Sequence, residues 1–436
     1  MAESDQNASG FLASARLVII GILVVIVVPA LAFVIAAIGQ SVSGESDAAQ
    51  PVALDSSNQC VTCHQRTTPG IVEQYSRSTM AAANVTCQNC HEVDAGYPEA
   101  KEHHGSYVLT VPTTAKCATC HEDEVRQFNL SRHGLPAYIA MWGTADLSEA
   151  HLALYESIPE GSFNPDRMRN ALFEIEGPAI TKFACAGCHN IGAPAADGSV
   201  GQCQTCHLRH EFSLEQARKP ETCNHCHIGP DHPQYEIYIE SFHGIAYLTS
   251  GEDWNWDAEP GTLTVQDFPA PTCATCHISG FGGASTTHDV GDRLTWYLFA
   301  PQSSRRPSWQ ENMARMQSVC TECHSQSFVD DFYADADALV EEINRRVQIS
   351  NDTIAPAREA GLLTDEPFDQ PIDFIHFDLW HHWGRTAKFG AWMGGPDYVQ
   401  WHGAYEILRD QVELEQIVRE LLEAAGLNGD AAESES

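Results

Sequence analysis

The pentapeptide CAGCH at residues 185–189 shows the pattern that decides the fold of this chain, because the same pattern occurs eight times. Each copy has the form C-x-x-C-H, with two cysteines three positions apart and a histidine directly after the second. The eight copies account for all 16 cysteines, so none is left for a disulfide or a free nucleophile. The cysteine pairs are Cys60 and Cys63, Cys87 and Cys90, Cys117 and Cys120, Cys185 and Cys188, Cys203 and Cys206, Cys223 and Cys226, Cys273 and Cys276, and Cys320 and Cys323.

This spacing predicts covalent attachment of eight haem c groups. Two thioether bonds fix each porphyrin edge, and the adjacent histidine supplies the proximal imidazole to the iron. Zinc sites need paired C-x-x-C units that close a tetrahedron, and a disulfide framework has no use for the histidine, so both alternatives are weaker. The predicted proximal ligands are His64, His91, His121, His189, His207, His227, His277 and His324.

The other 13 of the 21 histidines include candidates for the distal face of each iron. Four precede a glycine, which lets the backbone turn away beneath a crowded porphyrin, namely His104, His133, His243 and His402. Four more lie near motifs or in histidine clusters, namely His210, His225, His288 and His382. His151 and His376 are weaker candidates, and methionine is an alternative ligand. The count leaves open whether one iron keeps a free face.

Residues 17–38 form an apolar run without charged side chains, and Arg16 precedes it. The run is long enough to span a hydrocarbon layer of ~30 Å, so an uncleaved transmembrane anchor is favoured over a long cleaved signal. Residues 1–16 would then be a short cytoplasmic tail. Either alternative places the haem-binding part in the periplasm or outside the cell. Residues 39–58 are small and polar, which indicates a linker.

The rest of the sequence predicts a mostly α-helical multihaem cytochrome c fold, because no sustained alternation typical of a sheet occurs. In residues 59–330 the motifs are too closely spaced for each porphyrin to have its own protein core. We therefore expect the haems to pack together as the core. Residues 331–425 predict long C-terminal helices that pack on the haems and supply distal ligands, and residues 426–436 predict a disordered acidic tail. Residues 138–183, between two motifs, contain helical stretches that are expected to cover a site.

The formal net charge of −35 comes from 59 acidic and 24 basic residues. Nucleic acid is excluded as a partner, because phosphate contacts need clusters of lysine and arginine. The acidity is typical of docking to a basic electron-transfer protein, and an adaptation for solubility or salt explains it equally well.

Beyond the motifs, this chain resembles the hydroxylamine oxidoreductase family of octahaem cytochromes over residues 60–425. The similar segments are CQTCHLRHEFS at 203–213, CHIGPDHPQYEIYIESFHG at 226–244, THDVGDRLTWYL at 287–298, WHHWGR at 380–385 and PDYVQWHGAYE at 396–406. In that family the fourth haem is five-coordinate and catalytic, the other seven are bis-histidine, and the protein is a homotrimer. The resemblance implies a reaction centre at Cys185, Cys188 and His189.

The same resemblance implies that Asp231, His232 and Tyr297 lie over the open face of the fourth haem. In oxidising members, a tyrosine from the neighbouring subunit is covalently linked to the catalytic porphyrin. Tyr398 matches that tyrosine best, and Tyr405 is the second choice.

Three functions are compatible with these residues. Tyr398 favours oxidation of hydroxylamine, with electrons passing to a cytochrome c or the quinone pool. Reduction of nitrite or hydroxylamine on the same scaffold is the alternative, because an Asp–His pair serves either direction of proton transfer. A pure electron conduit has no need of Asp231 and His232, so it is the weakest of the three.

Overall fold

The computed structural model describes residues 51–158 and 163–427. The chain divides into two compact units, Met1–Leu54 and Asp55–Ser436, and the second unit holds all eight motifs. Within the described ranges, no helix is long and apolar enough to cross a membrane. Several predicted segments lie outside the described residues, namely the tail 1–16, the membrane helix 17–38, the linker up to residue 50 and residues 428–436.

The motifs lie in, or at the end of, short helices. Three helices consist of the motif alone, namely α6 (Cys87–His91), α13 (Cys185–His189) and α18 (Cys273–His277). Thr272 caps α18 by accepting from the backbone N–H of Thr275, which satisfies a free donor of the first turn. The other motifs begin in α3 (Gln59–Thr67), α7 (Thr114–Ala118), η3 (Cys203–Thr205), α15 (Pro220–Asn224) and α19 (Trp309–Cys320).

A small antiparallel sheet of order β1-β3-β2 lies between the second and third motifs. In the β2–β3 hairpin, His103 pairs with Ser106, so His104 and Gly105 form the turn, with φ of 52° and 88°. A second sheet has only two short strands, and helices dominate the rest, so the prediction of a mostly α fold is confirmed. The strands are β1 (Glu92–Val93), β2 (Lys101–His103), β3 (Ser106–Val108), β4 (Trp296–Tyr297) and β5 (Ser304–Arg305), and the helices around the first sheet are α4 (Pro69–Ser76), α5 (Thr79–Ala82) and α8 (Glu122–Leu130).

The insertion before the fourth motif is helical, as predicted. Ser148 caps α10 through the N–H of His151, and Leu135, Ile139 and Tyr155 form a small buried core with Val200. This core holds the insertion against the segment that follows the fourth motif. The helices are α9 (Leu135–Trp142), α10 (Glu149–Glu156), α11 (Ala171–Glu176) and α12 (Pro178–Phe183), followed by η2 (Asn190–Gly192).

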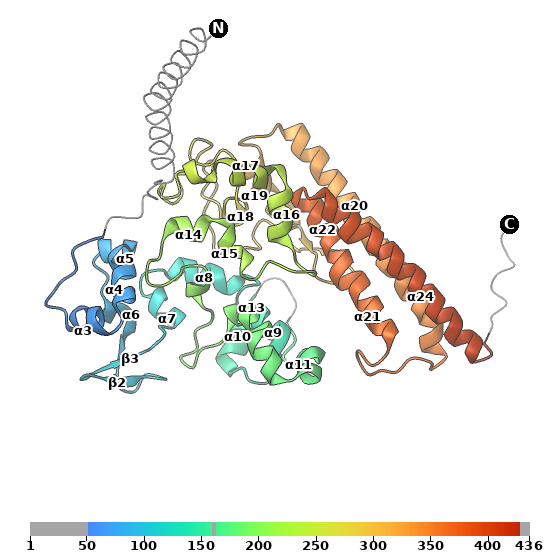
Figure 1. Ribbon diagram of the computed structural model, residues 1–436, viewed down its shortest axis with the longest axis horizontal. Coiled ribbons are helices and arrows are strands. Elements are labelled where there is room, and N and C mark those ends of the chain that lie inside the picture. Colours follow the sequence, from blue (N-terminus) through green and yellow to red (C-terminus); the bar gives the residue numbers. More distant parts are fainter. Residues whose placement is uncertain (1–50, 159–162, 428–436) are drawn as a thin grey trace, which may run out of the picture. The chain divides into compact units, whose positions relative to one another are not determined.

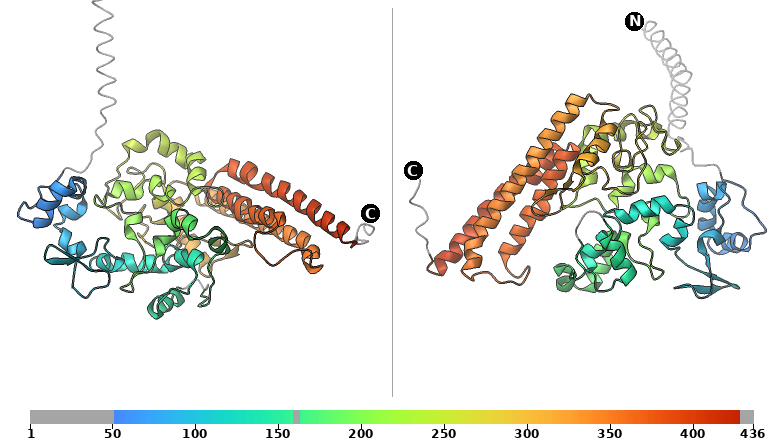
Figure 2. Two further views of the ribbon diagram at one scale, coloured as in Figure 1. Left: turned by 60° about the horizontal axis from the view of Figure 1, so that its bottom comes forward. Right: turned by 180° about the vertical axis from the view of Figure 1, so that it is seen from behind.

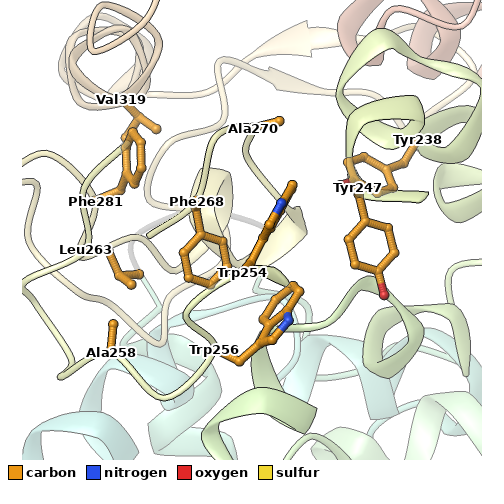
Figure 3. Close-up of a cluster of buried hydrophobic side chains, with 10 residues drawn as sticks. All are labelled: Tyr238, Tyr247, Trp254, Trp256, Ala258, Leu263, Phe268, Ala270, Phe281 and Val319. Atoms are coloured by element: carbon orange, nitrogen blue, oxygen red, sulfur yellow. The ribbon is translucent and has the colours of Figure 1, made fainter. Parts of the chain in front are cut away.

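An aromatic cluster fills the region between the sixth and seventh motifs (Figure 3). Trp254 and Trp256 stack with ring centres 5.6 Å apart, and the edge of Phe268 meets both rings. The hydroxyl of Tyr247 donates to the carboxylate of Glu221 at 2.7 Å. The helices of this region are α14 (Leu214–Arg218), α16 (Gln234–Glu240), α17 (Phe242–Ser250) and η4 (Gly251–Asp253).

The C-terminal part is a bundle in which the long helices α20 (Gln326–Glu359) and α24 (Tyr405–Ala424) lie side by side (Figures 1 and 2). Val347, Leu379 and Leu414 are fully buried in its core. The predicted boundary after residue 330 falls inside α20, so this helix joins the haem-binding part to the bundle. The remaining elements are α21 (Pro371–Phe377), the π-helix η5 (Asp378–Trp383), α22 (Gly384–Met393), α23 (Pro396–Val399) and the π-helix η6 (Gln400–Ala404).

Lys388 of α22 is completely buried and donates to Oγ of Ser303 at 2.8 Å. Burial, reinforced by the charge of Arg385, lowers the pKa of Lys388 from 10.5 to about 7. Between these two values the unfolded chain carries a proton that the folded protein lacks, so this group makes stability rise with pH across that window.

We predict that Lys388→Met abolishes this contribution, so that the melting temperature of the variant rises less from pH 7 to pH 10 than that of the wild type. Thermal unfolding followed by circular dichroism at several pH values measures the difference. Lys101→Met, at an exposed position of β2, is the matched control and keeps the wild-type slope. Equal slopes for the wild type and both variants would contradict the assignment.

Candidate haem sites and active site

Four motif histidines lie opposite a second histidine ring at the separation expected across an iron. Two metal–nitrogen bonds of about 2 Å, plus about 1 Å from each nitrogen to its ring centre, give about 6 Å. These pairs fit six-coordinate haem irons. The ring centres are 6.1 Å apart for His64 and His103, 6.3 Å for His91 and His210, 6.3 Å for His207 and His288, and 6.1 Å for His324 and His243.

The first of these pairs differs from the sequence prediction, which named His104. His103 ends strand β2, and its ring faces His64, whereas His104 occupies the hairpin turn. The glycine that suggested His104 serves the turn instead, because Gly105 adopts a positive φ. His103 therefore replaces His104 as the candidate ligand.

His227 of the sixth motif has two histidine neighbours. Its ring centre lies 5.9 Å from that of His133 and 6.1 Å from that of His232. Burial, with the charges of His227 and His277, lowers the pKa of His133 to about 3, which keeps its imidazole neutral as a metal ligand must be. His133 is therefore the candidate distal ligand for the iron of the sixth motif. His232 is then not needed as a ligand of that iron.

Other predicted distal histidines do not face a motif histidine. Nδ1 of His382 contacts Asp378 at 2.8 Å, and Nδ1 of His402 contacts Asp397 at 2.8 Å. A carboxylate on Nδ1 leaves Nε2 available to a metal, so both residues remain candidate ligands. The backbone carbonyl of His225 lies 3.9 Å from Sγ of Cys188.

The two weaker candidates are bound to polar side chains. Nδ1 of His151 lies 2.9 Å from Oγ of Ser148, and Nε2 of His376 lies 2.8 Å from Oδ1 of Asn351. The first contact is part of the N-terminal cap of α10, and the second joins α21 to α20.

Interactions between thiols of different motifs show which motifs are neighbours in space. Three pairs share a hydrogen bond, namely Cys117 with Cys203, Cys188 with Cys226, and Cys223 with Cys273. Four further pairs interact electrostatically, namely Cys60 with Cys87, Cys90 with Cys120, Cys206 with Cys223, and Cys276 with Cys320. The motifs therefore follow one another as first, second, third, fifth, sixth, seventh and eighth, and the fourth branches from the sixth.

Apolar side chains with unusual exposure lie beside motifs or candidate distal histidines. Phe183, two residues before Cys185, is 87% exposed, and Phe242, next to His243, is 90% exposed. Phe328 stacks on His324 with ring centres 4.8 Å apart. Exposed apolar surface of this kind marks a binding site, and beside a C-x-x-C-H motif a porphyrin face is the group that fits.

The fourth motif differs from the paired ones, because an acid–base pair approaches it. Nδ1 of His189 donates to the carbonyl of Ala137 at 2.7 Å, which leaves Nε2 for iron. Within the described residues, no second histidine ring lies against His189, and the same holds for His121 and His277. The thiol of Cys188, however, interacts electrostatically with both Asp231 and His232. The GPDHP segment is thus brought to the fourth motif.

Asp231 is surrounded by basic side chains. Its Oδ1 contacts Nδ1 of His232 at 2.7 Å, and its Oδ2 lies 3.3 Å from Nη1 of Arg385 and 3.8 Å from Nε2 of His381. Burial alone would raise the pKa of Asp231, but these three neighbours hold it at about 2. The carboxylate is therefore ionised at any working pH.

Arg385 and His381 are functional candidates outside the predicted set. Nε and Nη2 of Arg385 donate to the carbonyl of Phe299 at 2.9 and 2.6 Å, and Nη1 donates to Nε2 of His381 at 2.9 Å. Burial lowers the pKa of Arg385 to about 10, so it keeps its charge. The spacing of four residues between His381 and Arg385 was visible in the sequence, but their approach to Asp231 depends on the fold.

The two predicted tyrosines lie in different surroundings. The ring of Tyr297 lies between the guanidinium groups of Arg132 and Arg306, at 5.1 and 4.8 Å. Tyr398 stacks on His402 with ring centres 5.0 Å apart. Tyr405, the second choice, is 49% exposed on the surface of α24.

The fold and these haem sites define a multihaem c-type cytochrome, and comparison with known families agrees. The model of the family described as "Seven times multi-haem cytochrome CxxCH" matches residues 83–371, which hold the second to eighth motifs. A second family model, "Cytochrome c554 and c-prime", matches residues 36–92. The first match covers more than half of the chain, so the chain belongs to this multihaem cytochrome family.

Known relatives confirm the resemblance to hydroxylamine oxidoreductase-like proteins. The chain is 26% identical over 344 residues to a "Probable nitrite reductase-hydroxylamine oxidoreductase fusion protein" of Kuenenia stuttgartiensis, in a match that covers 66% of this chain but only 36% of that protein. The chain therefore spans about a third of the length of this relative.

Two solved structures share the fold. A "Hypothetical multiheme protein" aligns with a TM-score of 0.73 at 22% identity, over 87% of this chain and 98% of its own. The "Kuenenia stuttgartiensis reducing HAO-like protein complex Kustc0457/Kustc0458" aligns with a TM-score of 0.61 at 19% identity, over 87% of this chain and 89% of its own.

We predict that His103→Ala converts one haem from low spin to high spin, because it removes the ring that faces His64. The matched control, His104→Ala, leaves every haem in its wild-type spin state. Electron paramagnetic resonance of the oxidised proteins, with haem content checked by mass, measures both. A high-spin signal in the His104 variant alone would restore the sequence-based assignment.

Proposed function

We propose that this chain is an octahaem oxidoreductase that oxidises hydroxylamine at a five-coordinate haem on the fourth motif and passes the electrons through seven bis-histidine haems. The observation that carries the proposal is the Asp231–His232 pair in the segment after the sixth motif, together with the 3.9 Å approach of the carbonyl of His225 in that motif to Sγ of Cys188. An electron conduit needs no acid–base pair at that place. The proposal includes a haem-binding part outside the cytoplasmic membrane, anchored there by residues 17–38.

In this proposal Asp231 and His232 move the protons that leave the substrate together with electrons. The ionised carboxylate of Asp231 favours the tautomer of His232 that carries its proton on Nδ1. Nε2 of His232 is then the base that accepts a proton from the substrate. Arg385 fixes the second oxygen of Asp231 and so holds the pair in one orientation. The haem, when bound, supplies the electron acceptor.

Reduction of nitrite is a second candidate, because the Asp231–His232 pair can also deliver protons to a substrate. The relative from Kuenenia stuttgartiensis is named for both nitrite reduction and hydroxylamine oxidation, which supports testing both directions.

The proposal also includes a homotrimer in which Tyr398 of one subunit reaches the fourth haem of the next. Four apolar side chains repeat at helical spacing along η6 and α24 and remain about half exposed. A second copy of the chain would bury this stripe. The stripe consists of Trp401, Tyr405, Leu408 and Val412, with exposures of 58, 49, 52 and 57%.

We predict that Asp231→Asn lowers kcat by about 10²–10⁴-fold, because it removes the charge that orients and supports His232. Steady-state assays with hydroxylamine and an artificial electron acceptor, and with nitrite and a reduced donor, measure both directions on the same preparation. Asp352→Asn, an exposed carboxylate of α20, is the control and keeps the wild-type rates. If the wild type turns over neither substrate and no iron binds hydroxylamine or cyanide, the enzymatic proposal fails.

We predict that Leu408→Asp lowers the native mass from trimer to monomer, because a carboxylate cannot be buried in an apolar contact without a partner. Light scattering after size exclusion gives the mass, and the haem content stays unchanged since Leu408 lies on the surface. Gln416→Asp adds the same charge at another exposed position of α24 and leaves the assembly intact. A wild type that is already monomeric would reject the trimer.

A further inference from the structure

Arg293 is a buried arginine beside the seventh motif, and it takes no part in the proposed reaction. It is 3% exposed, and it lies in the segment between α18 and β4. Its Nη1 donates to the carbonyl of His277 at 3.2 Å, and its Nη2 donates to the carbonyl of Ser285 at 2.6 Å. Its Nε–H is also buried and has no acceptor among the residues that the structure describes. Two nitrogens therefore fix the guanidinium, and the third, Nε, still lacks an acceptor.

The charge of Arg293 is also uncompensated within the described part of the chain, where no ion pair joins it to a carboxylate. Its neighbour Asp292 exerts a favourable field on it, but the carboxylate of Asp292 is paired with Arg315 at 3.1 Å. A buried guanidinium without a counter-ion is strongly unfavourable. The missing partner is therefore expected to be a carboxylate from outside the polypeptide.

Haem groups are the source of carboxylates that the fold implies here. A haem bound through Cys273 and Cys276 carries two propionates on the porphyrin edge opposite its thioethers, and a guanidinium that extends along the ring from His277 binds a carboxylate with charge-assisted hydrogen bonds. The charge of Arg293 already acts on both Cys276 and His277. Arg306, which is 5% exposed, acts on His277 as well. The seventh motif thus has two buried cations in a chain whose net charge is −35.

We propose that Arg293 binds a propionate of the haem on the seventh motif and thereby raises the reduction potential of that haem. A nearby cation stabilises the reduced haem, which carries one positive charge less than the oxidised haem. The thiol interactions place the seventh motif next to the sixth, which has the fourth motif as a neighbour, and next to the eighth. The seventh haem then holds an electron more favourably than it would without Arg293, whichever way electrons pass between its neighbours. The inference holds for either direction of catalysis, because it rests on haem attachment alone.

Spectroelectrochemical titration of the intact protein without substrate tests this assignment. In Arg293→Met the reduction equilibrium constant of one haem equivalent falls at least tenfold, which is a shift of 59 mV to more negative potential. In Arg293→Lys, which keeps the charge, the midpoint potential of the same haem falls by less than half of the shift seen in Arg293→Met. Arg315→Met removes an arginine that is already paired with Asp292 and leaves every midpoint unchanged.

Haem content by intact mass decides how the titration is interpreted. If Arg293→Met keeps every haem and no midpoint moves, Arg293 is only a scaffold for the carbonyls of His277 and Ser285, and the proposal is wrong. Where the methionine variant fails to mature, Arg293→Gln keeps two donor hydrogens without charge, and the same tenfold fall is expected of it. An inactive enzyme whose midpoints shift as described would reject the proposed function and leave this assignment intact.

Discussion

Attachment of each haem through two thiols and a histidine from a single turn of chain is the constraint on which the rest of this structure depends. It explains why α13 is no longer than its motif, and why Phe183 and Phe242 project from the polypeptide almost fully exposed. Porphyrin faces are the groups expected to cover these rings. It also explains why the buried apolar residues fall into separate clusters, since the haems occupy the space that a continuous core would fill.

The C-terminal bundle has a different role, because it supplies basic side chains to the haem-binding part. Arg385 and Lys388 stand one turn apart on α22, and both are removed from water. Burying two cations is less favourable than packing apolar residues of similar size there, so stability alone does not account for them. Arg385 instead fixes Asp231, which lies 154 residues earlier in the chain. The long helices α20 and α24 give that contact a rigid frame.

The sequence was a reliable guide wherever a feature is local. The motif cysteines follow from a short pattern whose meaning does not depend on distant contacts, and His210, His243 and His288 were chosen as candidate ligands from similarly short segments. The motif histidine that each of them faces could not be predicted, because the pairs join segments far apart in the chain. At the first motif it is His103 that faces His64, not the predicted His104, because a glycine after a histidine can also serve a hairpin turn, and Gly105 does so here. Arg385 could not be predicted, since its role arises only when the GPDHP segment meets the bundle.

The acid–base groups at the fourth motif are compatible with both proposed directions of catalysis. Asp231 and His232 can take up or release protons, so they serve oxidation and reduction alike. Arg385 is paired with the ionised carboxylate of Asp231 at 3.3 Å, so the two charges largely offset each other and give no strong net attraction for nitrite. In the proposed reaction Arg385 therefore acts by orienting Asp231. The relative reduction potentials of the haems are then expected to decide whether electrons leave or reach the fourth motif.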